Sequence, residues 1–204
     1  MFRKAAGFTL IELLVVIGIL STLMVALLPQ ILAGQKEADI FADKTNLKWH
    51  YNNITIFRNR KLTLPREGGA KFVLAPWVKG VVERTPENRD RYFTPGVVEL
   101  DPRWNELKDE DPEDIWRDYD DIMADDTSYA GRAAKYYRTM KSDKEALMAN
   151  VFPDGTINVL LGGGQVRTLY KDGELAQYWD EDDPDFEIDV GEDSPVPVLR
   201  KLER

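Results

Sequence analysis

GFTLIELLVVIGIL, residues 7–20, is the stretch of this chain that decides its architecture. It opens an apolar run from Phe8 to Leu28, in which five residues are not apolar: Thr9, Glu12, Gly18, Ser21 and Thr22. About 20 helical residues span the roughly 30 Å hydrocarbon layer of a bilayer. A helix of this length in a water-soluble protein would carry a polar face, and this run carries none. The run therefore predicts one transmembrane helix.

The charges beside the run predict its orientation. Arg3 and Lys4 precede it, whereas Lys36, Glu37 and Asp39 follow it with mixed sign. Cytoplasmic flanks of membrane helices carry the excess of basic residues. We therefore expect a cytoplasmic N-terminus, a single pass through the cytoplasmic (inner) membrane, and a large periplasmic or extracytoplasmic part.

A secretory signal peptide is the alternative interpretation of the run. Its cleavage would need small side chains beyond the apolar core, and Ala33 and Gly34 are the candidates. Ile31 or Leu32 would then stand two residues earlier, where a small side chain is also needed. The apolar core is moreover long for a signal peptide, so a membrane anchor is the better interpretation.

The composition limits the possible functions. A net charge of -9 argues against nucleic acid as a partner, because phosphate binding requires a basic surface. The absence of cysteine excludes disulfides, a CxxC redox site and thiolate zinc sites. Charged residues make up 31% of the 204 residues, so the part that follows the apolar run is typical of a water-soluble domain.

Glu12 is the exceptional residue of the apolar run. A carboxylate inside a bilayer costs about 2.5–3.5 kcal/mol on insertion scales, and such residues are usually functional. One interpretation is that the Glu12 carboxylate has a functional role. The other is that its side chain simply reaches the nearby cytoplasmic interface.

Gly7, Phe8 and Glu12 stand in the register of a known signal. A basic leader with Arg3 and Lys4, then glycine, a hydrophobic residue and a glutamate four positions later resembles the class III signal of type IV pilins and type II secretion pseudopilins. The resemblance implies that a membrane prepilin peptidase cuts between Gly7 and Phe8. It also implies N-methylation of the new Phe8 amine.

The same resemblance implies roles for Glu12 and Pro29. In pilin-type filaments the amine of one subunit is expected to meet this glutamate of a neighbour. Pro29 stands where many pilins carry a proline, and it removes one helix hydrogen bond and favours a kink. The implied partners are other pilin or pseudopilin subunits, the prepilin peptidase and the inner-membrane platform of a secretion system.

The helix is expected to continue beyond the membrane, to about Asn59. Four apolar residues recur near a seven-residue spacing and predict one buried stripe: Ile40, Leu47, Tyr51 and Ile54. His50 lies between Trp49 and Tyr51, and we interpret it as a packing residue, not a ligand or base.

The remainder predicts an α+β, pilin-like domain, a small antiparallel sheet with long loops. Residues 65–105 suggest loops and short strands, with six core residues: Trp77, Val78, Val81, Val82, Tyr92 and Phe93. Two apolar runs around Gly162–Gly164 predict a β-hairpin, in which Ile157 and Val159 share a face. The predicted parts are a leader (1–7), a membrane and assembly segment (8–34), an amphipathic helix (35–60), a globular domain (61–179) and an acidic loop or tail (180–204).

Two acidic segments have calcium binding as an alternative interpretation. Residues 106–126 hold eleven acidic side chains, which we interpret as a solvated loop and short helix with four buried residues: Ile115, Trp116, Tyr119 and Ile122. The second segment, 180–193, is interpreted as a solvated tail. Calcium is the alternative in both, because clustered carboxylates suit that cation. The weak candidates in the second segment are Asp180, Asp182, Asp183 and Asp185.

Residues 127–169 resemble a narrower group, the prepilin-like proteins of planctomycetes and related bacteria. These have a SYAG segment and then His-x-Gly-Gly-x-Asn-Val-Leu-Phe-x-Asp-Gly-His-Val. The chain has SYAG at 128–131 and keeps six residues of the second element: Gly155, Asn158, Val159, Leu160, Gly164 and Val166. It has Pro153, Gly163 and Gln165 where the group has His, Asp and His. Any chemistry of those polar residues is therefore not expected here.

Three functions follow from these patterns. The first is a structural, non-enzymatic subunit of a type II secretion pseudopilus. The second is a type IV or surface-adhesive pilin whose acidic loops bind a ligand or calcium. The third is an enzyme on a pilin-like anchor. One histidine, no cysteine and no GxSxG elbow disfavour the third, although a carboxylate-only hydrolase stays open.

Overall fold

The structure is a computed structural model that describes residues 8–61, 63–138, 142–180, 183 and 186–204. The chain divides into two compact units, Met1–Asp39 and Ile40–Arg204. Helix α1, Leu10–Lys61, begins in the first unit and ends in the second, and it continues through Pro29. The predicted kink at Pro29 stays a prediction.

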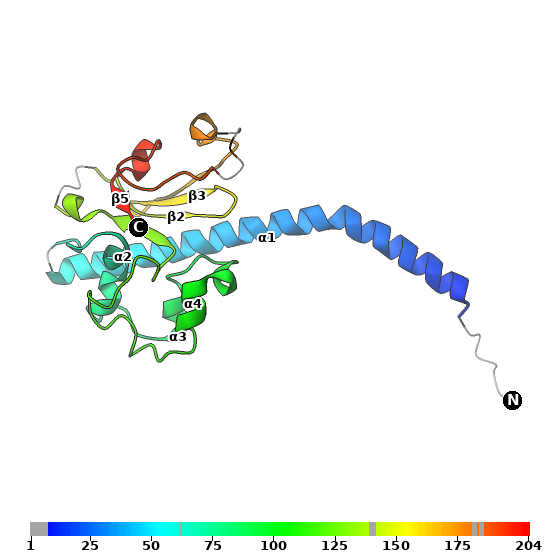
Figure 1. The fold of residues 1–204 in the computed structure, drawn as a ribbon, viewed down its shortest axis with the longest axis horizontal. Coiled ribbons are helices and arrows are strands. Elements are labelled where there is room, and N and C mark those ends of the chain that lie inside the picture. The colour runs from blue at the N-terminus through cyan, green and yellow to red at the C-terminus, as the bar shows by residue number, and fades with distance from the viewer. Residues whose placement is uncertain (1–7, 62, 139–141, 181–182, 184–185) are drawn as a thin grey trace. The chain divides into compact units, whose positions relative to one another are not determined.

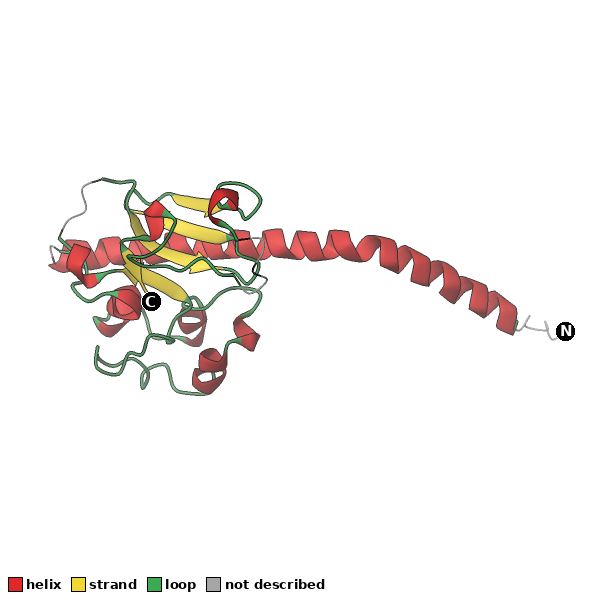
Figure 2. Ribbon diagram, turned by 45° about the horizontal axis from the view of Figure 1, so that its top comes forward, coloured by secondary structure: helices red, strands yellow, loops and turns green. Residues whose placement is uncertain are grey.

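The second unit has an α+β fold around one antiparallel sheet, which confirms the predicted fold class (Figures 1 and 2). The strands have the order β4-β3-β2-β1-β5, with bounds Tyr129–Arg132 (β1), Ala146–Val151 (β2), Ile157–Leu161 (β3), Val166–Leu169 (β4) and Leu202–Glu203 (β5). The further helices are α2 (Gly69–Val78), α3 (Pro86–Asp90) and α4 (Pro102–Leu107), with short 3₁₀ turns η1 (Val98–Leu100), η2 (Ala134–Tyr136), η3 (Ala176–Tyr178) and η4 (Pro197–Leu199).

The buried stripe of α1 has a spacing that alternates between three and four residues. It consists of Ile40, Asp43, Leu47, His50, Ile54 and Phe57, and Asn53 beside them is also buried. This is the spacing of one helix face. The predicted stripe was correct for Ile40, Leu47 and Ile54, whereas Tyr51 is only half-buried. The stripe also contains two ionisable residues, Asp43 and His50, which were not among the residues predicted for it.

The predicted hairpin is confirmed by β3 and β4. Ile157 pairs with Leu169 and Leu160 with Val166, and Gly164 lies in the loop 162–165 between the strands. Gly164 has a φ of 80°, a left-handed conformation that glycine adopts without strain. A Cβ at this position would lie 2.6 Å from Cε1 of Tyr51, so the loop also packs tightly against α1.

The sheet lies between two hydrophobic cores. On one side α1 and α2 pack with the loop 108–126, and this core contains Leu47, Trp77 and Tyr92. On the other side the segment after β4 covers the sheet with Leu175 and Leu199. Figure 1 shows α1 and the C-terminal segment on opposite faces of the strands.

One prediction about local structure was wrong. Residues 65–105 contain helices α2 and α3 and the start of α4, where loops and short strands or turns were expected. Helix α2 is an apolar run buried along nearly its whole length, so its sequence shows no helical period. The residues after 193 pack onto the fold, because Leu199 and Leu202 are buried and β5 pairs with β1, whereas the solvated tail expected at 180–193 stays a prediction.

Candidate functional site

The first candidate site is the beginning of α1, where Thr9 and Glu12 form a reciprocal cap. The Glu12 carboxylate accepts hydrogen bonds from the amide of Thr9 at 2.8 Å and from its hydroxyl at 2.6 Å. The Glu12 amide donates to the Thr9 hydroxyl at 3.3 Å. This is the capping-box arrangement, with threonine before the helix and glutamate three residues later. The carboxylate is therefore fixed beside the positive end of the helix dipole.

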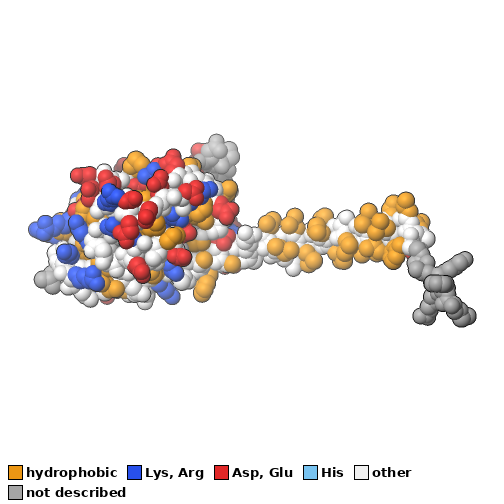
Figure 3. Space-filling view, turned by 90° about the horizontal axis from the view of Figure 1, so that it is seen from below, with side chains coloured by type: hydrophobic (Ala, Val, Ile, Leu, Met, Phe, Trp, Pro, Cys, Tyr) orange, Lys and Arg blue, Asp and Glu red, His pale blue; other side chains and the backbone are white. Residues whose placement is uncertain are grey.

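The predicted cleavage position lies at the border of the described chain. Gly7, like Arg3 and Lys4, falls outside the described residues, whereas Phe8 is described and 79% exposed. After Phe8 the large apolar side chains of α1 stay exposed as far as Leu32. Figure 3 shows them along this part of the helix. Such a surface requires lipid or other chains to cover it.

Among the described helices, α1 alone is long and apolar enough to cross a membrane. The chain is thus a single-pass, membrane-anchored protein, and the orientation predicted from its flanking charges stays a prediction.

The second candidate site is a buried polar cluster around Asp43. Its Oδ1 accepts from the Tyr129 hydroxyl at 2.7 Å and from Nδ2 of Asn150 at 2.9 Å. Its Oδ2 accepts from Nδ2 of Asn158 at 2.7 Å. Burial raises the pKa of the Asp43 carboxyl, while the three hydrogen bonds lower it and offset part of that cost. Asp43 thus joins α1 to three strands.

The partners of Asp43 form one row across the sheet. Tyr129 pairs with Asn150 in the β1–β2 ladder, Asn150 with Asn158 in the next ladder, and Asn158 with Thr168 in the last. The Thr168 hydroxyl donates to Oδ1 of Asn158 at 2.5 Å. Four neighbouring strands therefore place polar side chains in one row, of which Asp43 accepts hydrogen bonds from three, while Thr168 joins the row through Asn158.

His50 is a packing residue in the structure, as predicted. Its ring lies edge-on against Tyr92 and Tyr129, with centroid distances of 4.8 and 5.1 Å. Its Nε2 lies 3.0 Å from the carbonyl oxygen of Arg91, and because a carbonyl oxygen only accepts, this nitrogen donates. Burial lowers the pKa of His50 to about 4. A ring without solvent access cannot act as a base on a substrate.

The Asp43 cluster was missed because its members are far apart in sequence. Asn150 and Asn158 follow Asp43 by 107 and 115 residues. One signal was present: Asp43 stands three residues after Ile40 and four before Leu47, on the predicted apolar stripe. A carboxylate on such a stripe must find donors when it is buried.

Two of the four calcium candidates belong to the described chain. Asp180 is described and exposed, as is Asp183, whereas Asp182 and Asp185 lie outside the described residues. Over the described part of the chain, no group of three or more acidic or histidine side chains is arranged to hold a metal ion. Calcium binding by the segment 180–193 therefore stays a prediction.

One surface hollow, of about 610 Å³, brings Asp101 near Asp125, with Ser128 and Arg103 also in its wall. Asp101 is engaged in structure, because its Oδ1 caps α4 by accepting from the amides of Arg103 and Trp104 at 2.9 and 3.1 Å. This carboxylate is thus explained by the fold.

Comparison with known proteins agrees with the register at the N-terminus. A family described as the prokaryotic N-terminal methylation motif matches residues 2–28. No curated protein and no solved structure matches the chain. The chain therefore carries the class III signal of type IV pilin-like proteins, and the planctomycete-like element at 127–169 remains a resemblance.

Proposed function

We propose that this membrane-anchored, pilin-like substrate of a prepilin peptidase is a structural subunit of a type II secretion pseudopilus. The observation that carries the proposal is the methylation motif at residues 2–28, followed by a helix whose apolar side chains are uncovered. In this proposal α1 anchors the chain in the inner membrane before assembly. The same apolar surface packs against neighbouring subunits afterwards.

The geometry of Thr9 and Glu12 suggests how a free chain is kept ready for assembly. A carboxylate has about four acceptor positions on its two oxygens. The two donors of Thr9 both contact Oε2, so Oε1 has capacity for a further donor. Cleavage after Gly7 would create a cationic amine at Phe8. The amine of one subunit and Glu12 of the next would then neutralise each other in the packed helices.

In this proposal another protein supplies the energy for assembly. The sequence has no GxxxxGK[ST] motif for nucleotide phosphates. A separate cytoplasmic ATPase and an inner-membrane platform would drive assembly, and the globular unit would lie on the extracytoplasmic side. Secreted proteins, not small molecules, would be the objects moved. No catalytic role is assigned to the chain.

The first test is the mature N-terminus. Mass spectrometry of the protein from its native host should give a chain that begins at N-methylated Phe8. A Gly7→Glu variant should stay unprocessed, while Gly173→Ala, far along the chain, should be processed normally. An intact Met1 in the wild type, or a start near Gln35, would rule out the prepilin interpretation.

The second test separates a pseudopilus from a surface pilus. Deletion of the gene in the native host should leave folded exoproteins in the periplasm, and complementation should restore their export. Normal export together with loss of long surface filaments in electron micrographs would support the type IV or adhesive pilin instead. Calorimetric titration of the detergent-solubilised chain with calcium chloride would show whether its acidic loops contribute binding.

A further inference from the structure

Residues 109–125, here called the acidic strap, run over the aromatic core without a helix or strand of their own. They form turns and bends only. They contain nine acidic residues and one basic residue, Arg117. Every one of these nine carboxylates belongs to an exposed residue. The strap is therefore a strongly charged segment with little backbone structure to hold it.

Both ends of the strap are fixed by arginines from elsewhere in the fold. Before it, Nη1 of Arg89 donates to the carbonyl oxygens of Leu107 and Lys108 at 2.9 and 2.8 Å. After it, Nε of Arg103 contacts the buried carboxylate of Asp126 at 2.6 Å. The strap is thus a closed loop with anchored ends, and any opening involves only the residues between them.

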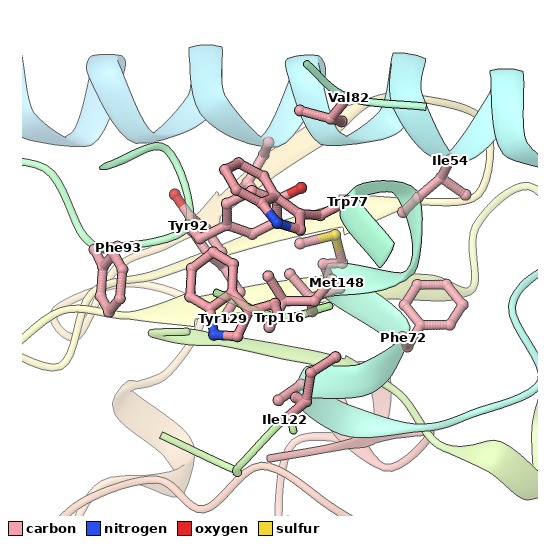
Figure 4. Packing of buried hydrophobic residues seen from close by; sticks show 14 of the residues in the cluster. Ile54, Phe72, Trp77, Val82, Tyr92, Phe93, Trp116, Ile122, Tyr129 and Met148 are labelled. Carbon is pink, nitrogen blue, oxygen red and sulfur yellow. The ribbon is translucent and has the colours of Figure 1, made fainter. Parts of the chain in front are cut away.

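The middle of the strap is held by three buried side chains. Ile115, Trp116 and Ile122 belong to the core below it. Nε1 of Trp77 donates to the carbonyl oxygen of Ile115 at 3.3 Å. The Trp116 ring meets the rings of Trp77 and Tyr92 edge-on, with centroid distances of 5.3 and 5.5 Å (Figure 4). The closed strap therefore excludes water from the aromatic core.

The closed state carries two local costs at Trp116. Its φ is 50°, and it is the one non-glycine residue of the described chain with a positive φ. Its Nε1 is buried without a hydrogen-bond partner in the described structure, and so is the hydroxyl of Tyr92. Buried polar groups without partners and backbone strain both oppose the closed state.

Charge repulsion adds to these costs. Over the described residues, the strap's acids form salt bridges to Arg84 and Arg117, through Glu113 and Asp114. Lys79 adds a weak attraction, with Nζ 4.7 Å from the centre of the Tyr119 ring. Asp111 and Asp118 also accept hydrogen bonds from amides of the strap itself. Salt screens the repulsion among exposed carboxylates of one sign. Raising the ionic strength should therefore remove more repulsion than attraction.

We propose that the acidic strap is a salt-controlled closure of the aromatic core. The strap opens between its two anchored ends, Lys108 and Asp126, while the sheet stays folded, and this opening exposes Trp77 and Tyr92. Low ionic strength favours the open state, and cations favour the closed one. Local opening of this kind is expected where backbone structure is sparse and charges are exposed.

Hydrogen exchange on the full chain in a nonionic detergent tests the proposal. At 20 mM sodium chloride the amides of the strap should exchange much faster than those of β2. At 500 mM their exchange should slow about tenfold, because salt screens exposed charges, while β2 should change little. Equal protection of strap and β2 would show that the strap opens only on global unfolding and would overturn the proposal.

A matched pair of triple variants separates the strap's charge from the charge of the whole chain. The variant D118N/D120N/D121N should show slow strap exchange already at low salt and a salt response reduced several-fold. The control E187Q/D189N/D193N removes three exposed acids elsewhere and should behave as the wild type. The same response in both variants would contradict the proposal. So would a larger effect of calcium chloride than of sodium chloride at equal ionic strength, since that would indicate a specific ion site.

Discussion

At the scale of single residues, His50 makes the stability of the fold depend on pH. Burial lowers its pKa to about 4, below the usual value of 6.5. The folded chain therefore binds this proton less readily than the unfolded chain. The stabilisation is complete above pH 6.5 and is lost as the pH falls from 6.5 toward 4. Over that pH range the pKa difference lowers the free energy of unfolding by about 3 kcal/mol, at 1.36 kcal/mol for each pKa unit.

The His50→Gln variant tests this dependence. A glutamine can still donate to the Arg91 carbonyl oxygen but does not titrate. The free energy of unfolding of the detergent-solubilised chain is measured with urea at pH 7.5 and pH 4.5. Between these pH values the wild type should lose about 2–3 kcal/mol more of this free energy than the variant. Because exposed carboxylates titrate equally in both proteins, the difference isolates His50. Identical losses would mean that the ring is not held neutral by burial.

Asp43 carries the polar row of the sheet, and its removal should be costly. Asp43→Ala removes the buried carboxylate that accepts from the Tyr129 hydroxyl and from the side-chain amides of Asn150 and Asn158, although the Asn158 amide keeps the Ile40 carbonyl oxygen as an acceptor. We expect a loss of about 3 kcal/mol in the free energy of unfolding. Asp172→Ala removes an exposed carboxylate and should change it by less than about 0.5 kcal/mol. Equal effects of the two variants in chemical denaturation would refute the role assigned to Asp43.

The residues that could be predicted from sequence are those whose role depends on local spacing. Gly7, Phe8 and Glu12 follow a short register, and Thr9 completes a capping box that the same register contains. Asp43 and Asn158 could not be paired in this way, because strand order and register bring them together. Asn158 is one of the residues on which the planctomycete-like resemblance rests, and in this chain its side chain donates to Asp43.

At the scale of elements, α2 and β1 approach each other through glycine. A Cβ on Gly131 would lie 2.2 Å from the carbonyl oxygen of Gly69 and 3.0 Å from Cγ2 of Val73. Gly131→Ala should therefore separate α2 from the sheet and destabilise the fold by about 3 kcal/mol. Gly173→Ala is the control, since its nearest atoms would lie at an ordinary 3.6 Å. A thermal shift no larger than that of the control would show that the contact relaxes freely.

The elements that could be predicted from the sequence are those with a local sequence pattern. The amphipathic part of α1 has a helical period, and the hairpin has alternation and a glycine turn. Helix α2 has neither, because both of its sides are buried and Pro76 lies inside it. That this apolar run forms a helix depends on its packing against β1, and a single sequence does not reveal this packing. The strand β5 is two residues long and follows an acidic segment, so it offered no strand pattern either.

At the scale of the whole molecule, assembly should depend on the charge of Glu12 and not on its capping role. Glu12→Gln keeps a side-chain acceptor for Thr9 and removes the charge that would meet a neighbour's amine. Thr9→Val keeps the charge and removes the hydroxyl that holds it. Glu12→Gln removes a carboxylate that costs about 2.5–3.5 kcal/mol inside a bilayer, and Thr9→Val replaces a hydroxyl by a methyl group without adding a charge, so we expect both variants to enter the membrane.

The two variants should then differ in filament formation. In the native host we expect Glu12→Gln to reduce the sheared filament fraction at least about tenfold, because an unpaired amine would have to be buried. Thr9→Val should assemble to a level near that of the wild type, since Glu12 can still meet the amine. Carbonate extraction checks membrane insertion, and immunoblotting of sheared filaments measures assembly. Normal assembly of Glu12→Gln would show that the carboxylate serves only the helix cap, and the cost of placing a charge in the membrane would then need another explanation.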